Sequence, residues 1–264
     1  MPSNEYLLVM TACIDPSAGH YPVDRADPAV RLLDYQHALR FWLSYPDARV
    51  RRILFIENSG HSLDSLKTIA ASENPLGKET EFLSLHCNWY PRTSHYGYAE
   101  MHMLDLGLNQ SRLRRETTHM IKVSGRLTFP SLSRLLDQIP DNFDFVADAR
   151  IWKTPWKKHG VPFVATQLIL FSHDFYSSHL QTQYDEMAGT YRRGHQRPLL
   201  ETFFYRKLAQ QPQSSEHARL LRFPCNVDPV GQPAHRSRSY SHPVQRVTNT
   251  FRAGMRRIAP GWWL

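Results

Sequence analysis

The stretch Tyr6-Leu-Leu-Val-Met-Thr-Ala-Cys-Ile14 is an almost unbroken apolar run, and Asp-Pro-Ser-Ala-Gly follows it directly. Apolar runs of this length without alternation are typical of a strand that is buried on both faces. The polar and glycine-containing residues after the run predict a loop. A strand covered on both faces indicates an α/β protein, in which helices pack on either side of a mostly parallel sheet.

The rest of the chain repeats this pattern of apolar runs separated by segments with helical spacing. We expect further strands over residues 52–60, 81–86, 119–123, 144–151, 163–171 and 220–223. We expect helices over residues 29–45, 62–72, 100–113, 131–139, 174–188 and 199–210. Strands that alternate with helices predict one α/β domain, over residues 1–228, whose mostly parallel central sheet is flanked by helices.

The net charge of +8 is concentrated at the end of the chain. No acidic residue follows Asp228, and the last segment contains Arg236, Arg238, Arg246, Arg252, Arg256 and Arg257. The first 228 residues are therefore close to electrically balanced, which argues against a broad nucleic-acid-binding surface. We expect residues 229–264 to form a basic linker followed by a helical tail.

The three cysteines, Cys13, Cys87 and Cys225, are far apart and lack zinc-ligand spacing. They are interpreted as reduced thiols. No basic segment precedes the run at residues 6–14, so we expect no signal peptide and a cytoplasmic location. No segment reaches the length of about 18 apolar residues that a membrane span needs.

Polar and charged residues follow three of the expected strands. Because ligands bind at the carboxyl ends of strands in such sheets, these residues are candidates for one binding site. The candidate binding residues are Thr11, Glu57, Asn58, Ser59, Lys122, Gly125, Arg126, Asp148 and Arg150. An ordinary turn at residues 57–60 and a structural network of ion pairs are the alternatives.

Lys122 and Arg126 have the chemistry of a diphosphate clamp. Arginine makes bidentate contacts with phosphate oxygens, and lysine acts as a point charge. Gly125 between them would let the backbone approach the ligand closely. In the alternative interpretation, the two cations pair with Asp148 or Glu57 and have only a structural role.

Several of these segments together resemble a group of GT-A glycosyltransferases that build bacterial and algal-virus surface polysaccharides. The resemblance covers roughly residues 5–225, and the pair of Glu57-Asn-Ser-Gly60 with Lys122-Val-Ser-Gly-Arg126 is its most specific part. The other matching segments are Asp34-Tyr35, Tyr96-Gly-Tyr-Ala-Glu100, Asp148-Ala-Arg150 and Glu201-Thr-Phe-Phe204. The resemblance implies a GT-A-like fold and a UDP-, GDP- or dTDP-sugar donor. It also implies a hexosyl- or deoxyhexosyltransferase, inverting, in polysaccharide or lipopolysaccharide biosynthesis.

The chain departs from the commonest GT-A pattern at one place. Many GT-A enzymes hold a divalent metal on the donor diphosphate with an Asp-x-Asp motif, and the matching position here is Asp148-Ala-Arg150. Two carboxylates suit a hard cation better than one carboxylate and one guanidinium do. We therefore expect weak or absent metal dependence, no dedicated metal ligands, and charge neutralisation by Arg150.

Sugar transfer with inversion needs a base that deprotonates the acceptor hydroxyl. The candidate catalytic residues are Glu100, Glu201 and Asp148, although a carboxylate in a first helical turn also complements the helix dipole. The aromatic-rich loop over residues 88–98 could close over the site and stack on a base or sugar ring. Ordinary surface packing is the alternative for that loop.

The end of the chain, residues 244–264, has apolar residues at helical spacing with arginines off that face. A basic amphipathic helix of this kind can lie on an anionic membrane surface, where polyprenyl-linked acceptors are found. We therefore expect a glycan or polyprenyl-linked acceptor and peripheral attachment at the inner face of the membrane. Docking of the apolar face on the domain is the alternative.

Two other function classes fit parts of this pattern. A non-catalytic adaptor could retain the GT-A-like fold and recruit partners through the basic tail. Another phosphate-handling α/β transferase, such as a nucleotidyltransferase, would usually need two or more metal-binding carboxylates together. A dinucleotide fold and a P-loop lack their glycine-rich signatures here.

Overall fold

A computed structural model of the 264-residue chain describes residues 5–19, 23–92, 94–151, 161–187, 199–232 and 254. The predicted amphipathic helix over residues 244–264 lies outside the described residues, apart from Gly254. The described chain continues along the domain beyond Asp228, because Val230 pairs with Thr128 in an isolated bridge. The proposed start of the tail at residue 229 stays a prediction.

Within the described residues, the central sheet has seven strands in the order β3-β2-β1-β4-β8-β5-β9. The strands are β1 (Tyr6–Ala12), β2 (Arg52–Glu57), β3 (Glu79–Ser84), β4 (His119–Ser124), β5 (Phe143–Val146), β8 (Leu168–Ser172) and β9 (Ala218–Leu220). All neighbours pair in parallel except β8, which is antiparallel to both β4 and β5. Strands β6 (Ala149–Ile151) and β7 (Pro162–Val164) form a separate antiparallel pair.

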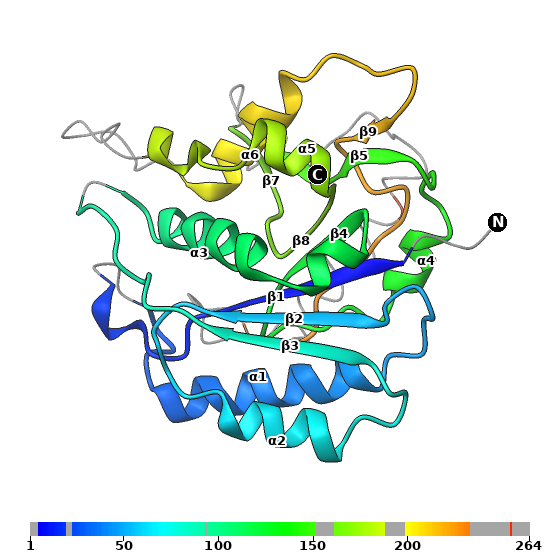
Figure 1. Ribbon diagram of the computed structural model, residues 1–264. Helices are drawn as coiled ribbons and strands as arrows, with labels where there is room; N and C mark the ends of the chain where they lie inside the picture. The colour runs from blue at the N-terminus through cyan, green and yellow to red at the C-terminus, as the bar shows by residue number, and fades with distance from the viewer. Residues whose placement is uncertain are drawn as a thin grey trace.

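Helices cover both faces of the sheet (Figure 1). One face carries α1 (Pro28–Leu43), α2 (Asp64–Ser72) and α4 (Leu132–Leu136). The other face carries α3 (Gly97–Gln110), α5 (His173–His179) and α6 (Leu200–Ala209). Short 3-10 helices lie at η1 (Pro16–Ala18), η2 (Leu113–Glu116) and η3 (Gln183–Met187). The predicted α/β architecture, a mostly parallel central sheet flanked by helices, is confirmed.

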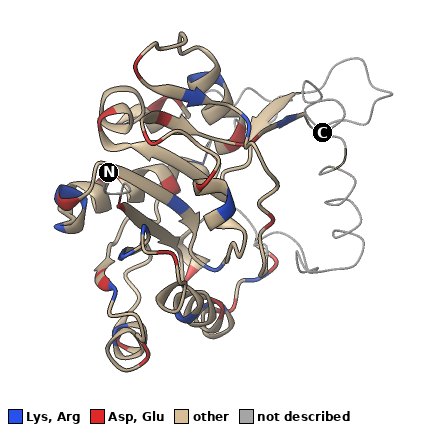
Figure 2. Ribbon diagram, turned by 90° about the vertical axis from the view of Figure 1, so that its right-hand side faces the viewer, with Lys and Arg blue, Asp and Glu red and all other residues tan. Residues whose placement is uncertain are grey.

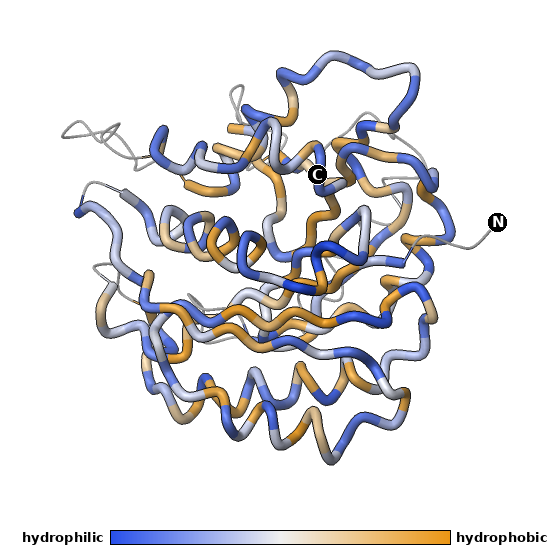
Figure 3. The backbone as a smooth tube through the Cα atoms, in the orientation of Figure 1, coloured by the Kyte–Doolittle hydropathy of each residue, from blue (hydrophilic) through white to orange (hydrophobic). Residues whose placement is uncertain are grey.

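Strand β1 separates two apolar cores. Tyr6, Leu8, Met10 and Ala12 point into the core under α1, and Leu7 and Val9 point into the core under α3. This alternation explains why the run is apolar at every position, because each side chain meets a covered face. Figure 3 shows the apolar strands as an orange band between the two helical layers.

A side-chain cap precedes the first turn of α1. The Asp27 carboxylate accepts a hydrogen bond from the backbone N–H of Ala29 at 2.8 Å, and Pro28 occupies the first turn. Such a cap stabilises a helix by about 1 kcal/mol. Leu63 precedes α2 and makes no side-chain cap, whereas the Ser62 hydroxyl accepts a hydrogen bond from the backbone N–H of Asp64 at 3.2 Å.

Two strand predictions were wrong in extent. Residues 144–151 form two strands, β5 in the central sheet and β6 outside it, and residues 163–171 divide into β7 and β8. The chain leaves β5, passes through the β6–β7 pair and re-enters the sheet at β8 without a crossover helix between them. A parallel neighbour needs a long crossover, so this route is consistent with β8 running antiparallel.

Acidic and basic residues are interspersed along the described part of the chain (Figure 2). This distribution agrees with the near-balanced charge of the first 228 residues. None of the helices described is long and apolar enough to cross a bilayer.

Candidate functional site

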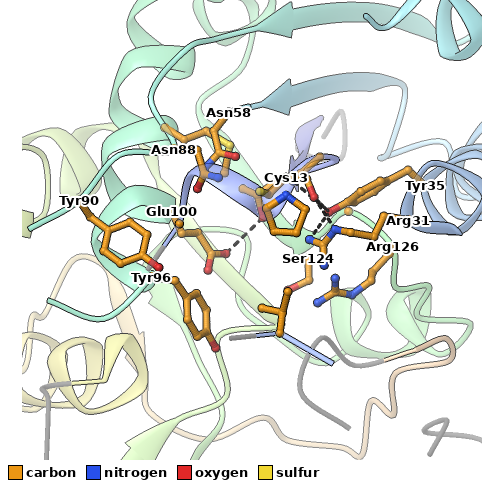
Figure 4. A pocket seen from close by; sticks show the side chains of 17 residues that line it. Cys13, Arg31, Tyr35, Asn58, Asn88, Tyr90, Tyr96, Glu100, Ser124 and Arg126 are labelled. Atoms are coloured by element: carbon orange, nitrogen blue, oxygen red, sulfur yellow. Dashed lines mark hydrogen bonds between the residues drawn. The ribbon is translucent and has the colours of Figure 1, made fainter. Parts of the chain in front are cut away.

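A pocket lies at the carboxyl ends of β1, β2 and β4, and all of its lining residues fall between Thr11 and Arg126 (Figure 4). Five residues predicted from the sequence line it, namely Thr11, Asn58, Glu100, Gly125 and Arg126. Pro16, Val23 and Met103 add apolar surface. A pocket with convergent polar groups on an apolar background is the usual form of a small-molecule site.

Glu100 is held in the pocket by two groups from neighbouring strands. The buried Lys122 ammonium forms a salt bridge with its carboxylate and also donates to the Thr166 carbonyl at 2.8 Å. The Thr11 hydroxyl lies 3.2 Å from both the Glu100 carboxylate and the Val123 carbonyl, and it donates to one of them at a time. The carboxylate of Glu100, whose side chain is 21% exposed, is therefore fixed in position at the pocket.

Lys122 does not lie where a diphosphate-binding residue was expected. It does not line the pocket; it lies beneath Glu100, where it is only 3% exposed. The structural alternative named Asp148 or Glu57 as its partner, and the observed partner is Glu100. A buried ammonium needs a paired carboxylate to offset its desolvation, and Glu100 fills that role.

Arg126 lines the pocket and has unpaired donors. Its Nε and Nη1 atoms are buried and have no hydrogen-bond partner among the described residues. The ion-pair partners expected in the structural alternative, Asp148 and Glu57, make no salt bridge with it. Buried donors without a partner are costly, so these two nitrogen atoms make Arg126 a candidate to bind an anionic ligand.

Glu57 and Ser59 shape the pocket from behind and do not line it. The Glu57 carboxylate accepts hydrogen bonds from the backbone N–H groups of Ile14, Ser59 and His61 at 2.9–3.1 Å. The Ser59 hydroxyl accepts from the backbone N–H of Asp15 at 3.1 Å. These contacts tie the loop after β2 to the loop after β1, so both residues position pocket walls.

Gly125 is explained by chain packing as well as by its place in the pocket. Its N–H donates to the Thr11 carbonyl at 2.8 Å. A Cβ atom at this position would lie 2.8 Å from the same carbonyl oxygen, which is closer than real contacts allow. The glycine thus permits the loop after β4 to approach β1, a reason that differs from the expected close approach of a ligand.

Asp148 and Arg150 lie outside the pocket lining. Asp148 is buried between β5 and β6, and the Arg150 guanidinium binds its carboxylate at 2.8 Å. The backbone carbonyl of Asp148, just before β6, also accepts from the N–H of Ala165, just after β7, at 3.0 Å. The geometry does not bring this pair together with Arg126, and its donor-binding role stays a prediction.

Glu201 lies close to Glu100, although it is not part of the pocket lining. A Cβ on Gly97 would lie 2.5 Å from the Leu200 side chain, so the starts of α3 and α6 pack closely. The Oε2 atom of Glu201 is buried and has no hydrogen-bond partner among the described residues. Burial raises the pKa of Glu201, and the nearby Glu100 carboxylate adds to the rise, whereas Lys122 lowers it. Such a group favours the protonated form.

Sequence reasoning assigned no role to the residues that hold the loop after β1, although Tyr35 belongs to one of the matching segments. The Tyr35 hydroxyl accepts from the Cys13 N–H at 3.0 Å, and the Arg31 guanidinium donates to the Cys13 carbonyl at 2.7 Å. Burial raises the pKa of the Cys13 thiol to about 12, so the thiol stays protonated. The signal for Arg31 and Tyr35 was their i, i+4 spacing in α1, which places both on one helix face.

The aromatic loop before α3 is divided between two environments. Tyr90 and Tyr96 line the pocket, whereas Trp89 is 66% exposed. Tyr98 is buried and donates its hydroxyl hydrogen to Asp185 at 3.0 Å. The loop is thus partly a pocket wall and partly packing, and its predicted closure over a ligand stays a prediction.

The described residues contain no group of three or more His, Cys, Asp or Glu side chains arranged to hold a metal ion. The donor set nearest the pocket is the pair of Glu100 and Glu201, and Lys122 already neutralises Glu100. These side chains do not fit a dedicated divalent-metal site.

Comparison with known proteins gives distant similarities of fold. No family model matches the chain, and no curated protein matches it. Solved structures with similar folds include 4-diphosphocytidyl-2C-methyl-D-erythritol synthase from Anaerococcus prevotii, with 10% identity and a TM-score of 0.41 over 94% of this chain and 98% of that one. The inositol-1-phosphate CTP transferase from T. maritima has 13% identity and a TM-score of 0.39 over 69% and 76% of the two chains. An active-site mutant of LgtC has 14% identity and a TM-score of 0.48 over 94% and 95%. Similarities this distant concern the course of the chain and do not say what it binds.

Proposed function

We propose that this chain is a nucleotide-sugar-dependent glycosyltransferase. It would transfer a hexosyl or deoxyhexosyl group to a glycan or polyprenyl-linked acceptor with inversion. The observation that supports this most is the unpaired Arg126 guanidinium in the same pocket as the fixed Glu100 carboxylate. One pocket then offers a cation for a diphosphate and a carboxylate for an acceptor hydroxyl.

In this proposal, Arg126 binds the donor diphosphate. Two of its nitrogen atoms are buried and unpaired, so a phosphate oxygen would gain charge-assisted hydrogen bonds without displacing a protein partner. As the bond to the sugar breaks, negative charge grows on the departing diphosphate. A guanidinium already fixed at that place stabilises the charge in the transition state.

Glu100 is the proposed catalytic base. The Lys122 ammonium forms a salt bridge with its carboxylate and holds it at the pocket. An acceptor hydroxyl that hydrogen-bonds to this carboxylate loses its proton to it while the oxygen attacks the sugar carbon. Glu201, whose pKa is raised, is the second candidate carboxylate and lies on the α6 side of Glu100.

The same proposal includes weak or absent metal dependence, a cytoplasmic location and attachment to the membrane surface. Neutralisation of the diphosphate by Arg126 would leave little need for a divalent cation, so we expect activity to persist in EDTA. Attachment to an anionic membrane through residues 244–264 would place the enzyme beside lipid-linked acceptors.

A binding experiment tests the proposal. Titration calorimetry with UDP, GDP and dTDP, with and without EDTA, is carried out on the full chain and on Arg126→Met. Arg134→Met, which removes an exposed arginine in α4, is the matched control. We expect at least one nucleotide to bind, the Arg126 variant to lose about 10- to 100-fold in affinity, and the control to be unchanged.

The turnover of nucleotide-sugars separates the rival functions. Release of free sugar from the donor that binds supports the glycosyltransferase, and Glu100→Gln should abolish that release without weakening nucleotide binding. Binding without any turnover, with or without acceptor lipids, would favour the adaptor. Formation of a nucleotide-sugar from a nucleoside triphosphate and a sugar phosphate would favour a nucleotidyltransferase.

A further inference from the structure

The side chain of Asn58 lies at the end of β2, where the backbone is fixed on both sides. Its N–H donates to the Ala12 carbonyl at 3.1 Å, and its own carbonyl accepts from the Cys87 N–H at 2.9 Å. The residue lines the pocket and is only 3% exposed. Its side-chain amide therefore has a defined position in the pocket wall.

A relay of hydrogen bonds fixes which way this amide points. The Asp15 backbone carbonyl can only accept, so the Asn88 nitrogen faces it, at 3.4 Å. The Asn88 oxygen then faces Asn58, and the Asn58 nitrogen donates to it at 3.5 Å. Both contacts are long, but turning either amide would bring two acceptors or two donors together.

The relay leaves one atom without a partner. The Oδ1 atom of Asn58 is buried and accepts no hydrogen bond among the described residues. A buried acceptor left unsatisfied is costly, and a ligand N–H that reaches it removes that cost. The lining of the same pocket also includes Pro16, Val23 and Tyr90, whose apolar surfaces suit the faces of a planar ring.

Figure 4 shows Asn58 and Asn88 together on one side of the pocket and Arg126 on another, with the end of β1 between them. A ligand that satisfies both residues therefore needs an anionic group at Arg126 and a hydrogen-bond donor at Asn58, at two separate places. A nucleoside diphosphate has this arrangement, because its base and its phosphates lie at opposite ends.

We propose that Asn58 is a specificity-determining residue, whose Oδ1 accepts a hydrogen bond from an N–H on the edge of the donor nucleobase. Asn88 is the positioning residue that presents this oxygen. The inference rests on the proposed function, since it assumes that the pocket binds a nucleotide. It adds that the base, and not only the diphosphate, contributes to affinity through one identified atom.

Calorimetry with two kinds of ligand tests this role. UDP, GDP and dTDP contain a base, and inorganic pyrophosphate is the matched ligand without one. Asn58→Leu removes the acceptor at similar size, and Asn58→Asp retains an acceptor. We expect the Leu variant to weaken the tightest nucleotide by about 5- to 50-fold, with pyrophosphate affinity unchanged. The Asp variant should bind that nucleotide more tightly than the Leu variant does.

Asn88→Leu should give a smaller loss, about 2- to 5-fold, again for nucleotides only, because Asn58 is present but no longer oriented. Thermal melting of each variant checks that the chain is folded. Equal nucleotide affinity in the wild type and Asn58→Leu would overturn the inference. So would a matching loss of pyrophosphate affinity, which would mean general damage to the pocket. Failure of the wild type to bind any nucleotide or pyrophosphate would instead refute the proposed function.

Discussion

Replacement of Arg126 by methionine should make the ligand-free protein more stable while it weakens nucleotide binding. Two guanidinium nitrogens are buried without a partner, and each unsatisfied group costs about 1–3 kcal/mol. Methionine retains most of the aliphatic contacts of the arginine stem. Because the side chain as a whole is only half-buried, we take the lower end of this range, a gain of about 1–2 kcal/mol.

For a domain of this size, that gain corresponds to a rise in melting temperature of about 3–6 °C. Urea unfolding and thermal melting of the wild type, Arg126→Met and the Arg134→Met control measure it without ligand. Added nucleotide should then raise the melting temperature of the wild type more than that of the variant. A loss of stability of 1 kcal/mol or more in Arg126→Met, without ligand, would refute the reasoning, since it would show that protein groups already satisfy this guanidinium.

Two further predictions concern the support of the site. Lys122→Met should destabilise the protein by about 2–3 kcal/mol in urea unfolding, because it leaves the Glu100 carboxylate partly buried without its partner. The double variant with Glu100→Gln should recover part of this loss, and strict additivity would contradict the pairing. Gly97→Ala should cost about 1–3 kcal/mol, because its Cβ would lie 2.5 Å from Leu200, and Leu200→Ala in the same chain should relieve the overlap. Equal melting temperatures of Gly97→Ala and the wild type would exclude that contact.

Burial lowers the pKa of His173 to about 4 from an ordinary 6.5. As the pH falls, the imidazole of His173 is therefore protonated in the unfolded chain before it is protonated in the folded one. Stability present above pH 6.5 should therefore be lost between pH 6.5 and 4, by up to about 3 kcal/mol. The stability of His173→Phe should depend less on pH over the same range. Identical pH profiles of the wild type and the variant in urea unfolding would show that His173 does not cause this loss of stability.

The fold could be predicted from the sequence where burial dictated composition. The run at residues 6–14 is apolar at every position because both faces of β1 are covered, and this alone indicates the class. The reversal of β8 could not be predicted, since a buried antiparallel strand and a buried parallel strand have the same composition. Tertiary pairing, and not local preference, divided residues 144–151 between two sheets.

The sequence predicted some of the residues that meet at the site, but it did not predict which side chains contact one another. Strand order is enough to bring Thr11, Asn58 and Arg126 to one edge, because they follow neighbouring parallel strands. It does not say which side chain meets which. The partnership of Lys122 with Glu100 depends on the position of α3, and the use of the Glu57 carboxylate by backbone N–H groups depends on loop geometry.

All residues that line the pocket lie between Thr11 and Arg126, and this has a consequence for biosynthesis. The four parallel strands β3, β2, β1 and β4 are complete at residue 124, whereas β5, β8 and β9 are made later and extend the sheet only from the open edge of β4. The ribosome delivers the chain from its N-terminus, but a domain generally folds as a unit. We therefore expect every residue of the pocket lining to be synthesised before β5, β8 and β9, and the pocket itself to form only when these last strands complete the sheet.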